Sequence, residues 1–154
     1  MYIRLQTILN KQGTSPQNHS NKRLGSIGEC IAQSYLRVKG YQLLVTNWHA
    51  PRRYAQAGEL DIVALSPDNL TLVFVEVKTR KPGRLGQGTE AIDRRKQARL
   101  SRLAALYLAL HPQQQGINCR IDCISICFPA PGKPADIHWL ENAFLPEECE
   151  LPHF

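Results

Sequence analysis

Two segments of the chain repeat apolar residues at the three- and four-residue spacing of an amphipathic helix. The first segment begins at Ser20 or Asn21, both good capping residues, and ends at Gly40, a natural helix stop. Its apolar face consists of Leu24, Ile27, Ile31, Tyr35 and Val38. The second helix is expected from Thr89 to about Leu110.

Apolar and β-branched runs predict the strands of a sheet. They are Tyr41–Asn47, Leu60–Leu65, Leu70–Val77, Arg120–Phe128 and, as an optional last strand, Ile137–Phe144. The turn residues 66–69 predict a hairpin, and the helix before the fourth strand predicts a parallel crossover. The sequence therefore predicts an α/β fold, a mixed sheet flanked by helices in the order α-β-β-β-α-β(-β).

The size and termini of the chain indicate one domain. Its 154 residues suffice for a single core. Residues 1–19 are polar and turn-rich, which predicts a flexible tail before a domain of residues 20–154. No apolar run reaches the ~18 residues of a membrane span, and the first residues do not resemble a signal peptide. We therefore expect a cytoplasmic protein with no membrane partner, whose five cysteines are reduced.

The net charge of the chain bears on the kind of partner that it binds. The chain has 19 Lys and Arg residues against 13 Asp and Glu, a formal charge of +6. A basic surplus favours a polyanionic partner, because each neutralised phosphate releases condensed counterions. Since many basic proteins bind no nucleic acid, the charge alone does not decide the function.

The informative charges lie at the ends of two apolar strands, as Gly-Glu-Leu-Asp at residues 58–61 and Val-Glu-Val-Lys at residues 75–78. Because side chains alternate along a strand, Glu76 and Lys78 share one face. A two- or four-residue loop would pair Leu65 with Leu70 and make Asp61 a diagonal neighbour of Glu76. A three-residue loop would place the two acids on opposite faces.

Convergent carboxylates on a sheet predict a cation site, because their repulsion destabilises the sheet unless a cation lies between them. Asp61 and Glu76 suit a hard ion such as Mg²⁺ or Mn²⁺, completed by a backbone carbonyl and waters. The ion would lower the pKa of a bound water, and Lys78 would hold that water and stabilise charge on a phosphate. The alternative is a surface hairpin with solvated charged ends.

Two further charged residues have both a functional and an ordinary interpretation. Glu29 falls at the border of the first helix's apolar arc, where it either reaches the rim of the sheet or is simply solvated. Lys96 falls inside the apolar face of the second helix, where it either extends to water or approaches the acids. We favour the functional interpretation for Lys96. Asp122 interrupts an apolar strand and is expected to be a structural acid, bonded to the backbone or to a base such as Lys96.

A basic run follows Lys78 in what is expected to be a mobile loop, residues 78–88. Arg80, Lys81 and Arg84 are candidates for contacts with nucleic-acid phosphates, and Arg99 on the second helix could extend that surface. The alternative is a solvated run of charge.

The same residues carry a resemblance to a known family. Asp61, fourteen intervening residues and Glu76-Val77-Lys78 resemble the PD-(D/E)xK signature of the restriction-endonuclease-like superfamily. More closely, the chain resembles the YraN-like family of proposed endonucleases, related in fold to archaeal Holliday-junction resolvases. The matching stretches span residues 24 to about 144, and include Gly25-x-x-Gly28-Glu29, residues 39–41, 47–48, 58–61, 72–80, Ala91-Ile92 with Lys96, and Arg120-Ile121-Asp122.

The resemblance implies a metal-dependent nuclease with DNA favoured over RNA, and branched or flapped DNA over plain duplex. It implies a metal held by Asp61, Glu76 and the Val77 carbonyl, with Lys78 catalytic and a further role for Glu29. Resolvases that cut two strands act as dimers, so a homodimer is a further expectation. The rival interpretation is a catalytically weak or inactive nucleic-acid-binding protein that keeps the same fold.

Overall fold

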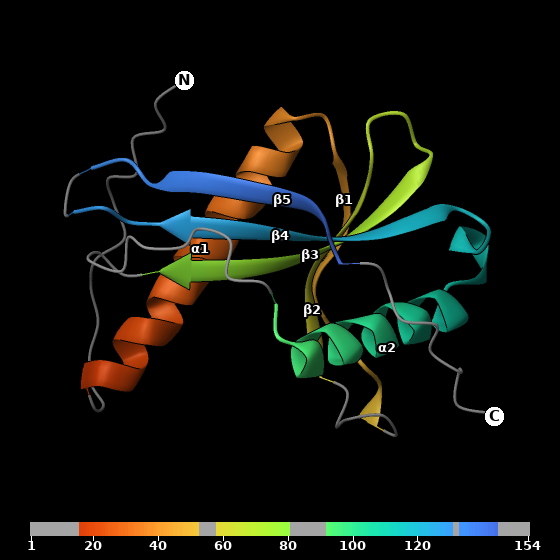
Figure 1. The fold of residues 1–154 in the computed structure, drawn as a ribbon, viewed down its shortest axis with the longest axis horizontal. Coiled ribbons are helices and arrows are strands. Elements are labelled where there is room, and N and C mark those ends of the chain that lie inside the picture. Colours follow the sequence, from red (N-terminus) through yellow and green to blue (C-terminus); the bar gives the residue numbers. More distant parts are fainter. Residues whose placement is uncertain (1–15, 53–57, 81–91, 131–132, 145–154) are drawn as a thin grey trace.

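The computed structural model describes residues 16–52, 58–80, 92–130 and 133–144. They form two long helices and five strands (Figure 1). In chain order the elements are α1 (Pro16–Val38), β1 (Gln42–His49), β2 (Glu59–Leu65), β3 (Thr71–Arg80), α2 (Arg94–Leu110), the 3₁₀ turn η2 (Pro112–Gln114), β4 (Asn118–Cys127) and β5 (Asp136–Phe144).

The strands form one mixed sheet in the order β1-β2-β3-β4-β5. β3 and β4 are parallel and are joined through α2, whereas the other neighbouring pairs are antiparallel. A parallel pair needs such a crossover because its strands run in the same direction. The α/β class, the mixed sheet, the parallel crossover and the element order are confirmed, and the optional last strand is present.

The two helices cover opposite faces of this sheet (Figure 1). On one face Leu100, Leu103 and Tyr107 of α2 pack against a core that includes Leu72 and Phe74 of β3. On the other face, α1 packs against the alternate β3 positions; the buried side chains there include Ala32, Leu36, Val73, Val75 and Ile124. Alternation along β3 therefore sends its even-numbered side chains toward α2 and its odd-numbered ones toward α1.

The first helix begins earlier than the sequence pattern predicted. Its first residue is Pro16, not Ser20 or Asn21, so residues 16–19 belong to the helix and not to a tail. Proline is tolerated in the first turn because the amide hydrogen it lacks would have no partner inside the helix.

Farther along α1, Gly28 lies against β3, where a Cβ atom would come within 2.0 Å of the Thr79 hydroxyl oxygen. The glycine therefore permits close contact between α1 and β3.

The second helix begins later than predicted. Asp93 precedes the first helical residue, and its carboxylate accepts a 2.9 Å hydrogen bond from the Lys96 amide. Such a cap satisfies one of the unpaired amides of the first turn, so the start expected at Thr89 is wrong. The basic segment also starts later, because residues 78–80 belong to β3 and not to a loop.

The β2–β3 hairpin has a different register from the one predicted. Leu65 lies opposite Leu72, not Leu70, because residues 67–70 all belong to the turn. Ser66 stabilises this longer turn: its hydroxyl accepts from the Thr71 amide at 3.0 Å. Its carbonyl accepts from Asn69, whose φ of 60° is left-handed. A shift of two positions preserves alternation, so each side chain of the paired residues, 62–65 and 72–75, keeps its face.

Both edge strands of the sheet are irregular. The β1–β2 register shifts between Leu43 and Val45, and the β4–β5 register shifts between Ile121 and Cys123. On β5 the irregularity includes Asn142, whose φ is 49°. Such bulges bend a strand and interrupt its ladder of hydrogen bonds.

Candidate active site

The candidate site lies where β2 and β3 separate. Their paired positions run from Leu65–Leu72 to Ile62–Val75 and stop there, although β2 starts at Glu59 and β3 continues to Arg80. Continuing the register by one residue on each strand brings Asp61 opposite Glu76. The fork between the two strands is thus bordered by the two acids that the sequence singled out.

Asp61 turns into this fork. Its Oδ2 accepts a 2.7 Å hydrogen bond from the backbone amide of Val77. Backbone amides of a strand lie near the plane of the sheet, so the carboxylate sits between the strands and not above one face. The neighbouring side chains support this position of Asp61. Leu60 packs in the core beneath α2 and Ile62 in the core beneath α1, although residues two apart on a regular strand share a face. The regular alternation of β2 is therefore interrupted at Asp61.

The pKa of Asp61 is raised from 3.8 to about 7. Burial is the largest cause, the negative charge of Glu76 the second, and Glu29 adds to both, while the Val77 amide and Lys96 act in the opposite direction. The charges of two other carboxylates therefore act on a buried acid. A cation close to Asp61 would offset this unfavourable effect.

Glu76 is a buried acid with a basic partner. Its side chain is 8% exposed, and its Oε1 accepts from the Nζ of Lys96, which is 27% exposed. Lys96 belongs to the first turn of α2, so this ion pair ties the helix start to β3. The structure thus places Lys96 beside the acids, as the functional interpretation of this residue expected.

Val77 presents its backbone to the fork. The amide and carbonyl of one strand residue point to the same neighbouring strand, and the Val77 amide points to Asp61. The Val77 carbonyl is therefore also directed to the β2 side, beyond the last ladder pair. This direction suits the predicted contribution of a main-chain oxygen to a metal.

Lys78 lies on the α2 face of the sheet beside Glu76. In the parallel β3–β4 ladder Glu76 neighbours Cys123 and Lys78 neighbours Ser125. Burial raises the pKa of the Cys123 thiol, and the charge of Lys78 acts on the same group in the opposite direction. The Lys78 ammonium is thus close to Cys123, the residue of β4 that pairs with Glu76.

Glu29 reaches this region from the opposite side. It follows Gly28, which lies against Thr79 of β3, and its charge contributes to the raised pKa of Asp61. Because Asp61 lies between the strands, groups on both faces can act on it. The structure thus brings Glu29 near the acids, and its catalytic role remains a prediction.

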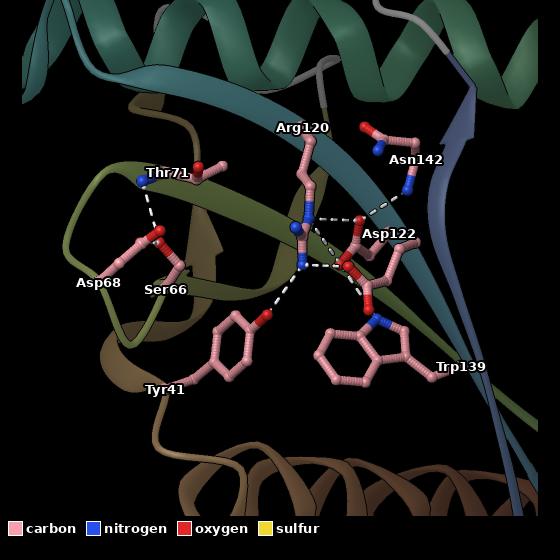
Figure 2. A network of polar contacts seen from close by, with 9 residues as sticks. Tyr41, Ser66, Asp68, Thr71, Arg120, Asp122, Trp139 and Asn142 are labelled. Atoms are coloured by element: carbon pink, nitrogen blue, oxygen red, sulfur yellow. Dashed lines mark hydrogen bonds and ion pairs between the residues drawn. The ribbon is translucent and has the colours of Figure 1, made fainter.

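Asp122 belongs to a separate network on the α1 face (Figure 2). It is fully buried and accepts hydrogen bonds from Arg120, the Trp139 indole and the Asn142 amide. Burial nevertheless raises its pKa. Asn142 lies within the β5 bulge, so the hydrogen bond from its amide to Asp122 stabilises that bulge. This confirms a structural acid, although its basic partner is Arg120 and not Lys96.

The predicted phosphate contacts are only partly within the described residues. Arg80 ends β3, two residues after Lys78, whereas Lys81 and Arg84 fall outside the described residues. Arg99 lies on α2, and its guanidinium is near Gly58; a Cβ added there would be 3.6 Å from an Arg99 nitrogen. Since Gly58 precedes β2, Arg99 is near the start of the strand that carries Asp61.

Side chains alone do not supply three metal ligands here. Within the described ranges no group of three His, Cys, Asp or Glu side chains is arranged to hold an ion. Mg²⁺ does not need such a group, because it is commonly held by one or two carboxylates and keeps several waters. Two carboxylates and a carbonyl at one fork therefore fit this kind of ion.

The sequence of the chain matches the family described as "Uncharacterised protein family UPF0102" over residues 28–126. A UPF0102 protein of Stutzerimonas stutzeri (strain A1501) is 38% identical over 120 residues, which cover 78% of this chain and 92% of the relative. The chain belongs to the UPF0102 family. This is the YraN-like family that the motifs indicated.

Other UPF0102 members match over nearly their whole length. A UPF0102 protein of Alkaliphilus oremlandii (strain OhILAs) is 38% identical over 125 residues, covering 80% of this chain and 99% of the relative. UPF0102 protein XAC0764 of Xanthomonas axonopodis pv. citri (strain 306) is 34% identical over 130 residues, covering 84% and 98%. The family match contains Asp61, Glu76, Lys78 and Lys96 within its bounds.

Proposed function

We propose that this UPF0102 protein hydrolyses phosphodiester bonds in nucleic acid with the help of Mg²⁺ or Mn²⁺. The observation that carries the proposal is the fork between β2 and β3, where Asp61 and Glu76 converge and the pKa of Asp61 is raised to about 7. Burying acids together is unfavourable without a compensating cation, and contacts to phosphate alone would need only basic residues.

Each group at the fork has a distinct part in this reaction. Asp61, Glu76 and the Val77 carbonyl would hold the ion, which supplies an acidified water and offsets charge on the phosphate. Lys78 would orient the attacking water and stabilise the negative charge that develops on phosphorus-bound oxygens. The water oxygen would form the new bond to phosphorus as the bond from phosphorus to the sugar oxygen breaks. The attacking water would lose one proton to solvent, and the leaving sugar oxygen would take one up from solvent. Glu29 would adjust the charge of the site from the α1 side.

DNA is the proposed substrate, in preference to RNA, and branched or flapped DNA in preference to plain duplex. Arg80, Lys81, Arg84, Lys96 and Arg99 would contact its phosphates. A homodimer would be needed to cut two strands at a junction. These finer points rest on the resemblance and on the basic charge of the chain.

One observation favours a second function, nucleic-acid binding without useful catalysis. Glu76 already has a cationic partner in Lys96, so part of the buried charge is compensated without metal. A member of the fold that had lost hydrolysis could keep this ion pair for stability.

A cleavage screen separates the two functions. Purified protein is incubated with single-stranded, duplex, flap and four-way-junction DNA and with RNA, each with Mg²⁺, Mn²⁺ or EDTA. Metal-dependent cleavage that Glu76→Ala abolishes supports the enzyme. Cleavage at an unchanged rate in Glu76→Ala would show that the activity is a contaminant or lies elsewhere, and binding without cleavage would favour the second function.

Lys78 can be separated from the metal ligands in the same screen. Lys78→Ala should still bind Mn²⁺, as measured by calorimetry, but should cleave at least ~100-fold more slowly because charge stabilisation in the transition state is lost. Glu76→Ala should lose both properties. If Lys78→Ala cleaves as fast as the wild type, Lys78 is not catalytic.

A further inference from the structure

Both the backbone and the side-chain ammonium of Lys96 make polar contacts. Its backbone amide donates to the capping carboxylate of Asp93, which places the residue in the first turn of α2. Its ammonium contacts Glu76 Oε1, and its charge also acts on Asp61. The helix start is therefore positioned so that one cation of the chain sits among the acids of the fork.

The ammonium occupies the place where positive charge is required. Glu76 is 8% exposed, so its carboxylate is poorly hydrated, and it would be unfavourable there without a cation. A divalent ion held by Glu76 and Asp61 would meet the same requirement. Even if that ion used the other oxygen of Glu76, the ion and the ammonium would share one poorly hydrated carboxylate, where the repulsion between two cations is strong.

We propose that Lys96 is an internal counter-ion that competes with the divalent cation for Glu76. Lys96 pairs with Glu76 in the metal-free protein, and it releases Glu76 when the metal binds. The released ammonium, still attached to the first turn of α2, can then pair with a substrate phosphate. This inference rests on the proposed function, because it assumes that the fork binds a divalent cation.

Calorimetric titration with Mn²⁺ tests the competition without measuring activity. Lys96→Met keeps the length of the side chain and removes its charge, so its affinity for Mn²⁺ should exceed that of the wild type by roughly tenfold or more, a usual size for coupling between two sites. Arg95→Met is the matched control, because it removes the same charge from an exposed position on the same helix turn. Its affinity should change by less than about threefold, since exposed charges are well screened.

Lysine labelling of the wild-type protein tests the release directly. Reaction with a limiting amine reagent, read by mass spectrometry, should modify Lys96 slowly without metal and several-fold faster at saturating Mg²⁺. The exposed Lys39 and Lys133 serve as internal standards whose rates should not change.

The outcomes distinguish this inference from the metal site itself. If the wild type binds Mn²⁺ but Lys96→Met binds it no more tightly than Arg95→Met, the competition is refuted. If Lys96 labels equally fast with and without Mg²⁺, the release is refuted. If neither the wild type nor Lys96→Met binds Mn²⁺ more tightly than an Asp61→Asn variant, the metal site fails and the inference fails with it.

Discussion

Asp61 combines a main-chain hydrogen bond with a pKa raised to about 7, which makes it sensitive to pH near neutrality. In the unfolded chain its pKa should return to about 3.8. Between these two values the folded protein binds the proton more strongly than the unfolded one. The contribution of Asp61 to stability is therefore greatest below pH 3.8 and is lost as the pH rises to about 7.

This difference predicts how the metal-free protein responds to pH. Relative to Asp61→Asn, the free energy of unfolding of the wild type should fall between about pH 4 and pH 7, by up to ~4 kcal/mol. Urea unfolding of both proteins at several pH values in EDTA provides the measurement. A constant difference across this range would show that Asp61 is not perturbed.

Metal binding should depend on the same proton. Near neutral pH about half of the metal-free protein carries a proton on Asp61, and a metal ligand must lose it. Below pH 7 the affinity for Mn²⁺ should therefore fall, approaching ~10-fold per pH unit. Calorimetry at pH 6 and pH 8, in buffers of different ionisation enthalpy, measures both the affinity and the proton released. Binding without proton release at pH 6 would contradict this assignment.

At the residue scale the sequence indicated which side chains meet, but not how they meet. Alternation and turn chemistry were enough to bring Asp61 and Glu76 together, because a shift of two positions leaves the side chains of the paired residues, 62–65 and 72–75, on their faces. The rotation of Asp61 into the fork and the approach of Glu29 from the other face depend on where the ladder ends. That point is determined by packing across strands, which a single sequence does not display.

Among the elements, the contact between α1 and β3 depends on Gly28. A methyl group at this position would meet the Thr79 hydroxyl oxygen at 2.0 Å, so Gly28→Ala should destabilise the protein by roughly 1–3 kcal/mol. Gly25 is the matched control, because nothing lies within 4 Å of the Cβ it would acquire. Gly25→Ala should be neutral or stabilise the helix by about 0.5–1 kcal/mol.

Denaturant unfolding of both variants makes the comparison, and Thr79→Ala in the Gly28→Ala background completes it. Removing the hydroxyl should recover part of the lost stability. If Gly25→Ala and Gly28→Ala have the same effect, α1 does not approach β3 as closely at Gly28 as the structure indicates.

Element type and order could be predicted because apolar periodicity directly reflects which faces are buried. The ends of elements were less accurate for identifiable reasons. Asp93 is a strong capping residue, yet the preceding residues also permit a helix, so only the hydrogen bond to Lys96 decides where α2 starts. The longer turn after Ser66 depends on hydrogen bonds to its hydroxyl and carbonyl, which the order of turn residues does not specify.

At the scale of the whole molecule, the net charge of +6 should make nucleic-acid binding dependent on salt. Replacing Arg80, Lys81 and Arg84 by alanine should reduce the slope of log affinity against log salt by about 2 to 3, close to one unit per lost phosphate contact. The control is a variant with alanine at the exposed α1 positions Lys22, Arg23 and Arg37. Equal slopes for both variants would mean that the segment after β3 is merely solvated.

Neither described helix combines the length and apolar character needed to cross a membrane. The four cysteines within the described residues, Cys30, Cys119, Cys123 and Cys127, are free thiols, as expected for them.

The bulges of β1 and β5 bear on how copies of the protein can associate. A regular, exposed edge strand can pair with the edge of another molecule and extend the sheet, which leads to open-ended aggregation. Here both edges of the described sheet are interrupted, and on β5 the interruption is held in place by the buried Asp122. Continuous sheet extension across two copies is therefore disfavoured. Weakening the bulge, as in Asp122→Asn, would remove a protection against fibrous assembly as well as a source of stability.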